Sequence, residues 1–144
     1  YQWTSEYPNQ TFRTMNLGEE IIFRPMRPYP QMKFCDGTSF RDDGVVLGQE
    51  LWFDIHLPKR SAPTQLTLAI KCPFLPTGTL SIQEGNTLLA DFFIKEQQEL
   101  TVPVTLPPGD EQTLRLNFKF MPKFRNREPL RVPLRIMLQR MALN

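Results

Sequence analysis

Apolar and polar residues alternate with a period of two along most of the chain. This pattern is typical of strands that bury one face and expose the other. In the segment 50–57, ELWFDIHL, four aliphatic or aromatic residues from Leu51 to Leu57 share one face, and Trp52, Asp54 and His56 share the other. Four further segments show the same alternation and predict half-buried strands at 65–72, 99–106, 113–120 and 129–138.

Shorter segments and turn sequences complete the pattern. A strand is predicted at 19–24, and two more at 79–83 and 88–94. The second pair flanks Glu84-Gly85-Asn86, where glycine and asparagine accept the positive φ of a hairpin turn. The sequence LPPGDEQ at 106–112 predicts another turn. About eight or nine strands at roughly ten-residue spacing predict an all-β fold: a single antiparallel β-sandwich of the jelly-roll kind.

The length and composition fit one globular domain. The chain has 144 residues, of which 40% are hydrophobic and 22% charged. Residues 1–16 are weakly patterned and are expected to form a linker or an edge segment, and 17–144 the β-sandwich. No apolar run approaches the ~18 residues that a membrane-spanning helix needs. We expect an excised domain whose parent chain carries any targeting or membrane segment.

The formal net charge is only +2, but the basic residues gather toward the end of the sequence. A basic end suits an anionic partner such as phosphate, an acidic glycan or lipid headgroups, and it also fits a solvated strand face. Arg131 and Arg135 fall on the expected outer face of the last strand. They could hold a phosphate or carboxylate by forked hydrogen bonds. A nucleic-acid partner is disfavoured, because the aromatic residues fall mostly on core-facing positions.

Residues for catalysis or metal binding are scarce. His56 is the single histidine, and no GxSxG elbow accompanies it. Two acidic pairs, Asp42/Asp43 and Asp110/Glu111, lie in turn-like sequence, where carboxylates are common for backbone reasons. Cys35 and Cys72 could form a disulfide or remain buried thiols, and neither has the spacing of a zinc site. We therefore expect a non-catalytic domain without a metal or other cofactor.

The polar face of the segment 50–57 is the first candidate binding site. An exposed tryptophan can stack on a sugar ring while polar neighbours bond its hydroxyls. Trp52, Asp54 and His56 meet that description if their face is open. The alternative is that another strand, the N-terminal segment or the parent protein covers Trp52.

The order of motifs along the chain resembles a known accessory domain. MNLGEEIIFR is followed by DGTSFRDDGVVLGQELWFDIHLP, then by LTLAIKCPFLP, the hairpin LSIQEGNTLLADFFI, QELTVPVTLPPGDEQTLRLNFKF and the closing EPLRVPLRIMLQRMAL. This order, from about residue 16 to 143, is similar to the C-terminal accessory β-sandwich of bacterial envelope-glycan enzymes. These enzymes are the surface-polysaccharide glycosyltransferases and the phosphoglycerol transferase of periplasmic glucans.

The resemblance implies a role and a location. It implies a module that holds a glycan or anionic glycan acceptor, or aids assembly, beside the other domains of its parent enzyme. The place would be the periplasm or cell envelope, or alternatively the cytoplasmic face of the inner membrane, near the membrane through the parent chain. The alternative function is a docking module for a protein or a membrane surface that binds no sugar.

The resemblance also suggests a role for the glycine-framed segment 37–48. In such domains the segment folds against the sandwich, so Phe40 and Val46 would anchor it to apolar surface. Asp42 or Asp43 takes the place of the family's glutamate, and Val46 that of its second tryptophan. The acidic pair would cap backbone N–H groups or meet Arg131. The closing EPLR, at 128–131, resembles the family's Asp-Pro-Arg segment.

Overall fold

The computed structural model describes residues 12–25, 28–72, 77–95, 99–123 and 135–144. Arg131, the EPLR segment and the first half of the strand expected at 129–138 lie outside these ranges. All secondary structure in the described part of the chain is β, and every strand pairing is antiparallel. The described residues contain no helix that could cross a membrane.

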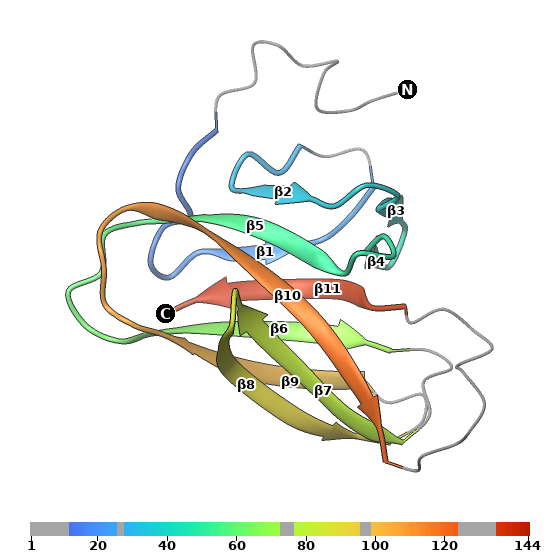
Figure 1. Ribbon diagram of the computed structural model, residues 1–144. Helices are drawn as coiled ribbons and strands as arrows, with labels where there is room; N and C mark the ends of the chain where they lie inside the picture. Colours follow the sequence, from blue (N-terminus) through green and yellow to red (C-terminus); the bar gives the residue numbers. More distant parts are fainter. Residues whose placement is uncertain (1–11, 26–27, 73–76, 96–98, 124–134) are drawn as a thin grey trace.

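Six strands form the first sheet. Its order is β3-β4-β11-β6-β9, and β1 also pairs with β11 (Figure 1). The bounds of these strands are β1 Glu20–Ile22, β3 Ser39–Arg41, β4 Gly44–Val46, β6 Thr64–Lys71, β9 Glu99–Leu106 and β11 Met137–Leu143.

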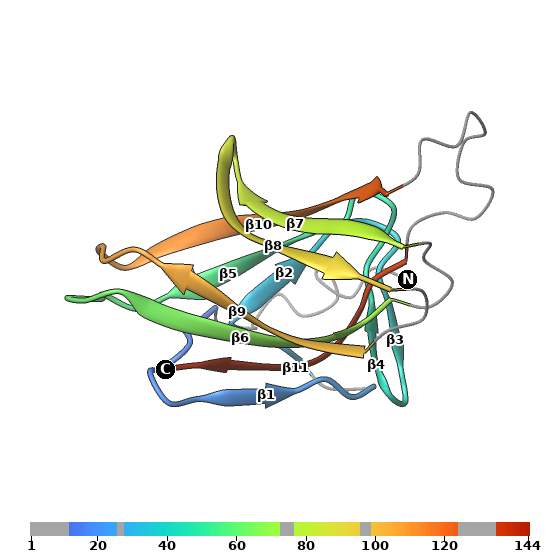
Figure 2. The same ribbon diagram turned by 90° about the horizontal axis from the view of Figure 1, so that it is seen from below.

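Five strands form the second sheet, in the order β2-β5-β10-β7-β8. Figure 2 shows the two sheets as separate layers. The bounds are β2 Met32–Phe34, β5 Trp52–Leu57, β7 Gly78–Glu84, β8 Thr87–Ile94 and β10 Gln112–Pro122. The all-β sandwich is thereby confirmed. Eleven strands are present in the described ranges rather than the expected eight or nine, because β2, β3 and β4 have three residues each and are too short to show an alternation.

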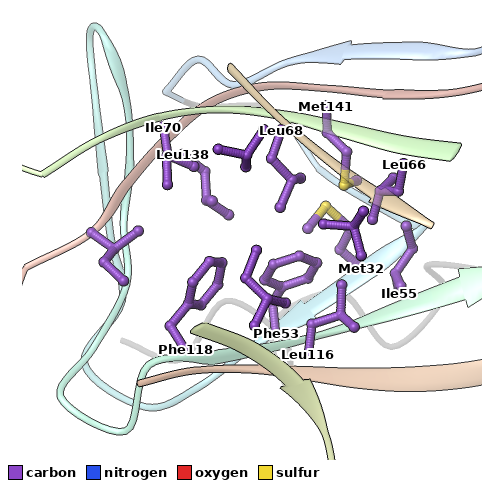
Figure 3. Close-up of a cluster of buried hydrophobic side chains, with 14 of the residues drawn as sticks. Met32, Phe53, Ile55, Leu66, Leu68, Ile70, Leu116, Phe118, Leu138 and Met141 are labelled. Carbon is purple, nitrogen blue, oxygen red and sulfur yellow. The ribbon is translucent and has the colours of Figure 1, made fainter. Parts of the chain in front are cut away.

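The core lies between the sheets, and both contribute to it (Figure 3). Phe53 of β5 and Phe118 of β10 come from one sheet, with ring centroids 6.0 Å apart. Leu68 of β6 and Leu138 of β11 face them from the other sheet and are fully buried. Burial of each such side chain contributes roughly 1.5–3 kcal/mol, so the alternating apolar residues stabilise the sandwich.

The predicted core faces are confirmed in β5, β6, β9 and β10, while the last strand differs. It begins at Met137 and runs to Leu143. Its pairing with β6 shifts between Leu138 and Arg140, so the buried positions become Met141 and Leu143. A bulge of this kind changes which residues face inward, and strict alternation cannot anticipate it.

The segment 37–48 forms the hairpin β3–β4 instead of an irregular loop. Phe40 packs against the core, with its ring 5.6 Å from that of Phe34, and Val46 is buried. Phe40 therefore packs on apolar surface as the resemblance implied, whereas Val45 and Leu47, rather than Val46, join the core. A Cβ atom on Gly44 would lie 2.5 Å from the carbonyl oxygen of Leu138, so glycine lets the hairpin approach β11 closely.

The described N-terminal residues are joined to the sandwich. Met15 is fully buried, and its N–H donates to the carbonyl of His56 at 2.8 Å. Arg13 forms two hydrogen bonds with the carboxylate of Glu19, at 3.0 and 2.6 Å. Gln31 donates to the same carboxylate at 2.9 Å. These bonds hold the pKa of Glu19 at about 2, with Arg13 as the largest cause.

Candidate functional site

Trp52, Asp54 and His56 lie together on the outward face of β5, as the alternation predicted. Their direct neighbours on β10 are Asn117, Arg115 and Thr113, in that order. Directly paired residues of antiparallel strands point to the same side of the sheet. The sequence therefore builds one surface from two strands that are far apart in the chain.

Arg115 and Glu50 hold Trp52 in place. The Arg115 guanidinium lies 3.6 Å from the centroid of the Trp52 ring and covers one face of it. The same guanidinium binds the Asp54 carboxylate through two contacts, at 2.8 and 3.2 Å. The indole N–H of Trp52 donates to the Glu50 carboxylate at 2.8 Å. Hydrogen bonding to Asp54 is the main cause that raises the pKa of Arg115.

The three predicted residues differ in how accessible they are. Asp54 is 9% exposed, because Arg115 and the neighbouring strand cover it, whereas Trp52 is half-buried. His56 accepts or donates a hydrogen bond at Nδ1 with the hydroxyl of Thr113, at 2.6 Å. The ring of Phe12 packs edge-on against His56 at 5.2 Å. Trp52 thus remains partly exposed although Arg115 covers one face of its ring, and the Asp54 carboxylate is bound to Arg115.

The polar surface continues from β10 onto β7 and β8. Asn117 pairs with Gln83, and Lys119 pairs with Ser81, which in turn faces Asp91. These side chains offer amide, hydroxyl, ammonium and carboxylate groups on the same outward face as Trp52. Such a mixture supplies both donors and acceptors for hydrogen bonds.

Arg135 lies just before β11 rather than on its outer face. It lines a hollow of about 490 Å³ beside the start of β5, together with Asp36, Ser39, Gln49 and Glu50. Glu50 also bonds Trp52, so the hollow adjoins the tryptophan. The role of Arg135 as an anion ligand remains a prediction, and Arg131 lies outside the described residues.

Sequence reasoning missed Arg115, Glu50 and Asp36. Arg115 has the outward phase in the segment 113–120, so its exposure was readable. Its partner was not, because the order of strands in the sheet decides which side chains become neighbours. Asp36 and Glu50 flank the glycine-framed segment and carried no periodic signal.

Three kinds of reactive arrangement bear on catalysis among the side chains of the described residues: a histidine triad, an activated cysteine and a metal cluster. His56 bonds Thr113, but its Nε2 atom is buried and has no hydrogen-bond partner, so no carboxylate orients the ring as in a triad. Both cysteines are free and buried, and burial raises the pKa of Cys72 to about 12, which suppresses the thiolate. No group of three histidine, cysteine or acidic residues suited to a metal occurs within the described ranges.

No protein-family model and no curated protein matches this sequence. Several solved structures are similar to this chain, and two of them are of similar extent. One is the CBM36-1 domain of a multidomain xylanase from the hindgut metagenome of Trinervitermes trinervoides, with 12% identity and a TM-score of 0.46, covering 88% of this chain and 97% of that one. The other is a CBM36 carbohydrate-binding module in complex with calcium and xylotriose, with 9% identity, a TM-score of 0.45 and coverage of 88% and 99%.

Proposed function

We propose that this chain is a non-catalytic carbohydrate-binding module, and that a glycan lies along the outward face of β5 and β10. The observation that carries the proposal is the half-buried Trp52, held in a fixed position by Arg115 and Glu50 at the edge of a polar sheet face. An aromatic ring fixed in this way loses little freedom when a ligand packs on it, which favours binding.

The neighbouring groups suit a sugar. A pyranose presents apolar C–H groups on its face and hydroxyls around its rim. The exposed part of Trp52 would take the C–H groups, while Asn117, Gln83 and Ser81 are placed to bond hydroxyls along the sheet. Arg115 contacts both Trp52 and Asp54. Its side chain is 50% exposed, so further N–H donors remain open to a ligand.

The biological setting is part of the same proposal. The order of motifs supports an accessory role in a bacterial enzyme that makes or modifies cell-envelope polysaccharide. The module would hold acceptor glycan near that enzyme or aid its assembly, in the periplasm or envelope or on the cytoplasmic face of the inner membrane. The scarcity of catalytic groups on the described surface is consistent with an accessory role.

A glycan array followed by calorimetric titration tests the function. The chain is screened at low and at physiological salt, and the best hit is titrated against wild type, Trp52→Ala and Phe93→Ala. Loss of a central aromatic contact costs about 2 kcal/mol, so Trp52→Ala should weaken binding roughly thirtyfold. Phe93→Ala removes an exposed aromatic at the far end of the sheet and should leave the Kd unchanged. Equal effects of the two variants, or an array without hits, would contradict the proposal.

A second candidate function rests on a different part of the same sheet face. Phe93 is 52% and Met121 74% exposed, and they flank Thr79 in one row across β8, β7 and β10. The ammonium of Lys123 lies 5.6 Å from the Phe93 ring, and Lys119 is exposed nearby. Apolar side chains among lysines suit an anionic membrane surface. Co-sedimentation of the chain with phosphatidylglycerol vesicles would favour this function. Phe93→Ser should abolish this co-sedimentation, and phosphatidylcholine vesicles should not sediment the chain.

A further inference from the structure

The hollow beside Trp52 has rigid walls. The hydroxyl of Thr38 donates to the carbonyl of Cys35 at 2.7 Å and accepts from the N–H of Gly48 at 3.1 Å. A Cβ atom on Gly48 would lie 1.9 Å from the carbonyl oxygen of Asp36, so the two sides of the hollow meet at a glycine that no larger residue can replace without movement. The backbone on which Asp36 stands is thus fixed before a ligand arrives.

The turn that carries Glu50 is equally constrained. Leu51 has a φ of 56°, a left-handed conformation that is rare for a branched residue. Two hydrogen bonds hold it: its N–H donates to the carbonyl of Gly48 at 3.0 Å, and its carbonyl accepts from Phe118 at 2.9 Å. Its side chain is buried in the core. Backbone strain of this kind persists only where the surrounding structure enforces it, and here it positions Glu50 between the hollow and Trp52.

The polar groups in the hollow are open to a ligand. Among the described residues, neither Asp36 nor Arg135 has a hydrogen-bond or ion-pair partner for its side chain. Glu50 uses one carboxylate oxygen for Trp52. Ser39 and Gln49 add a hydroxyl and an amide. The hollow of about 490 Å³ therefore combines hydrogen-bond acceptors and donors that do not bond to one another.

The charge of the hollow discriminates between ligand types. Within the lining, Asp36 and Glu50 carry two negative charges against the single positive charge of Arg135, while Arg115 interacts with Glu50 from the neighbouring sheet face. An acidic sugar would gain from the guanidinium but would be repelled by both carboxylates at short range. A neutral sugar donates its hydroxyls to the carboxylates and accepts from Arg135, and hydrogen bonds to charged groups are the stronger ones.

We infer that the hollow is a second subsite, which takes one uncharged sugar residue of a glycan packed on Trp52 and selects neutral over acidic glycans. This inference rests on the proposed carbohydrate-binding function and names its substrate class. Arg135 acts in it as a donor to hydroxyls, and the net negative charge around Arg135 opposes its use as an anion site.

Titration of variants of the 144-residue chain with neutral and acidic oligosaccharides tests the inference. The probes are cellohexaose, laminarihexaose and mannohexaose on one side and hexagalacturonate on the other. Wild type should bind one or more neutral hexaoses more tightly than hexagalacturonate. Asp36→Asn should weaken neutral binding about tenfold, because an acceptor for charge-assisted hydrogen bonds is lost. The same variant should also reduce the ratio of the Kd for hexagalacturonate to the Kd for the neutral hexaose.

Asp43→Asn is the matched control, since it removes the same charge from the exposed tip of the β3–β4 hairpin. Thermal melts establish that both variants fold, and Arg135→Gln provides a second variant, for which weaker neutral binding is expected. If Trp52→Ala loses binding while Asp36→Asn and Arg135→Gln match Asp43→Asn, the proposed function stands and the subsite is overturned. Tighter binding of hexagalacturonate than of every neutral hexaose also overturns it. If wild type binds no oligosaccharide at all, the proposed function fails and the subsite with it.

Discussion

The outward face of the five-stranded sheet carries an aromatic residue at each of two distant places, and the surroundings of the two differ. Trp52 on β5 has an Arg115 guanidinium against its ring and a Glu50 carboxylate on its N–H. Phe93 on β8 is 52% exposed, and its described contact with charge is a lysine at 5.6 Å. One aromatic residue is held by a network, while the other stands on a more distant strand with few restraints.

The difference shows what an outward-facing aromatic residue needs in order to act as a specific site. A fixed ring with polar groups at known distances can distinguish one ligand shape from another. A loosely held ring among lysines offers apolar area and charge, which suit a broad surface such as a membrane. Position on the sheet, rather than the number of aromatic residues, therefore separates the proposed glycan site from the proposed membrane-docking site.

The largest expected effect comes from the inward side of the same strand. Phe53→Ala should lower the free energy of unfolding by about 3–5 kcal/mol, because it leaves a cavity where a fully buried ring packs beside Phe118. Phe93→Ala should change it by less than about 1 kcal/mol, since a half-exposed ring leaves no closed cavity. Urea unfolding of both variants measures the difference. Similar losses would mean that Phe93 is held more firmly than its contacts indicate.

The next largest effect should distinguish Arg115 from Lys119, two basic residues of β10, by thermal stability and tryptophan fluorescence. Arg115→Ala removes the ion-pair partner of the largely buried Asp54 carboxylate and uncovers a face of Trp52. It should lower the Tm clearly and shift the Trp52 fluorescence to the red, measured in a Trp3→Phe background. Lys119→Ala should do neither, because among the described residues Lys119 has no ion-pair partner. An unchanged emission maximum in Arg115→Ala would show that the guanidinium does not shield the ring.

A smaller effect should depend on pH. The pKa of Glu19 is about 2 in the folded chain, below its ordinary 4.5, because Arg13 binds its carboxylate. The stabilisation is present in full above pH 4.5 and is lost as the pH falls through about 2. The loss should be about 1–2 kcal/mol after allowance for solvent screening. In Glu19→Gln, the free energy of unfolding should vary less with pH over this range, as measured by acid titrations followed by circular dichroism. An unaltered pH dependence in this variant would argue against the ion pair of Glu19 with Arg13.

The smallest effect concerns the link between the hollow and the ring. Glu50→Gln keeps an acceptor for the Trp52 N–H and removes one charge, so stability should change by less than about 0.5 kcal/mol. The fluorescence anisotropy decay of Trp52 should remain that of a fixed ring. A mobile ring in Glu50→Gln would show that the charge, and not the hydrogen bond alone, holds it.

Much of the fold was predictable because burial and alternation are local properties of a strand. The segment 99–106 coincides with β9, and the outward phase of Trp52, Asp54 and His56 was read from the sequence. The network around Trp52 was not predictable, since Arg115 lies 61 positions from Asp54 and meets it only through the pairing of β5 with β10. The hollow depends in the same way on a hairpin and on the residue that precedes β11. Local patterns fix which side a residue faces, and the order of strands decides its neighbours.

The position of β11 has a consequence for how the chain is made. It follows the other described strands in the sequence, yet it pairs with β1, β4 and β6 and therefore lies inside its sheet. During synthesis, β1 and β4 cannot be joined to β6 in one sheet until β11 has been made, because β11 pairs with all three. A nascent chain that stalls before residue 137 would expose the pairing edges of β4 and β6 together. The six-stranded sheet can therefore close only after β11 has been made.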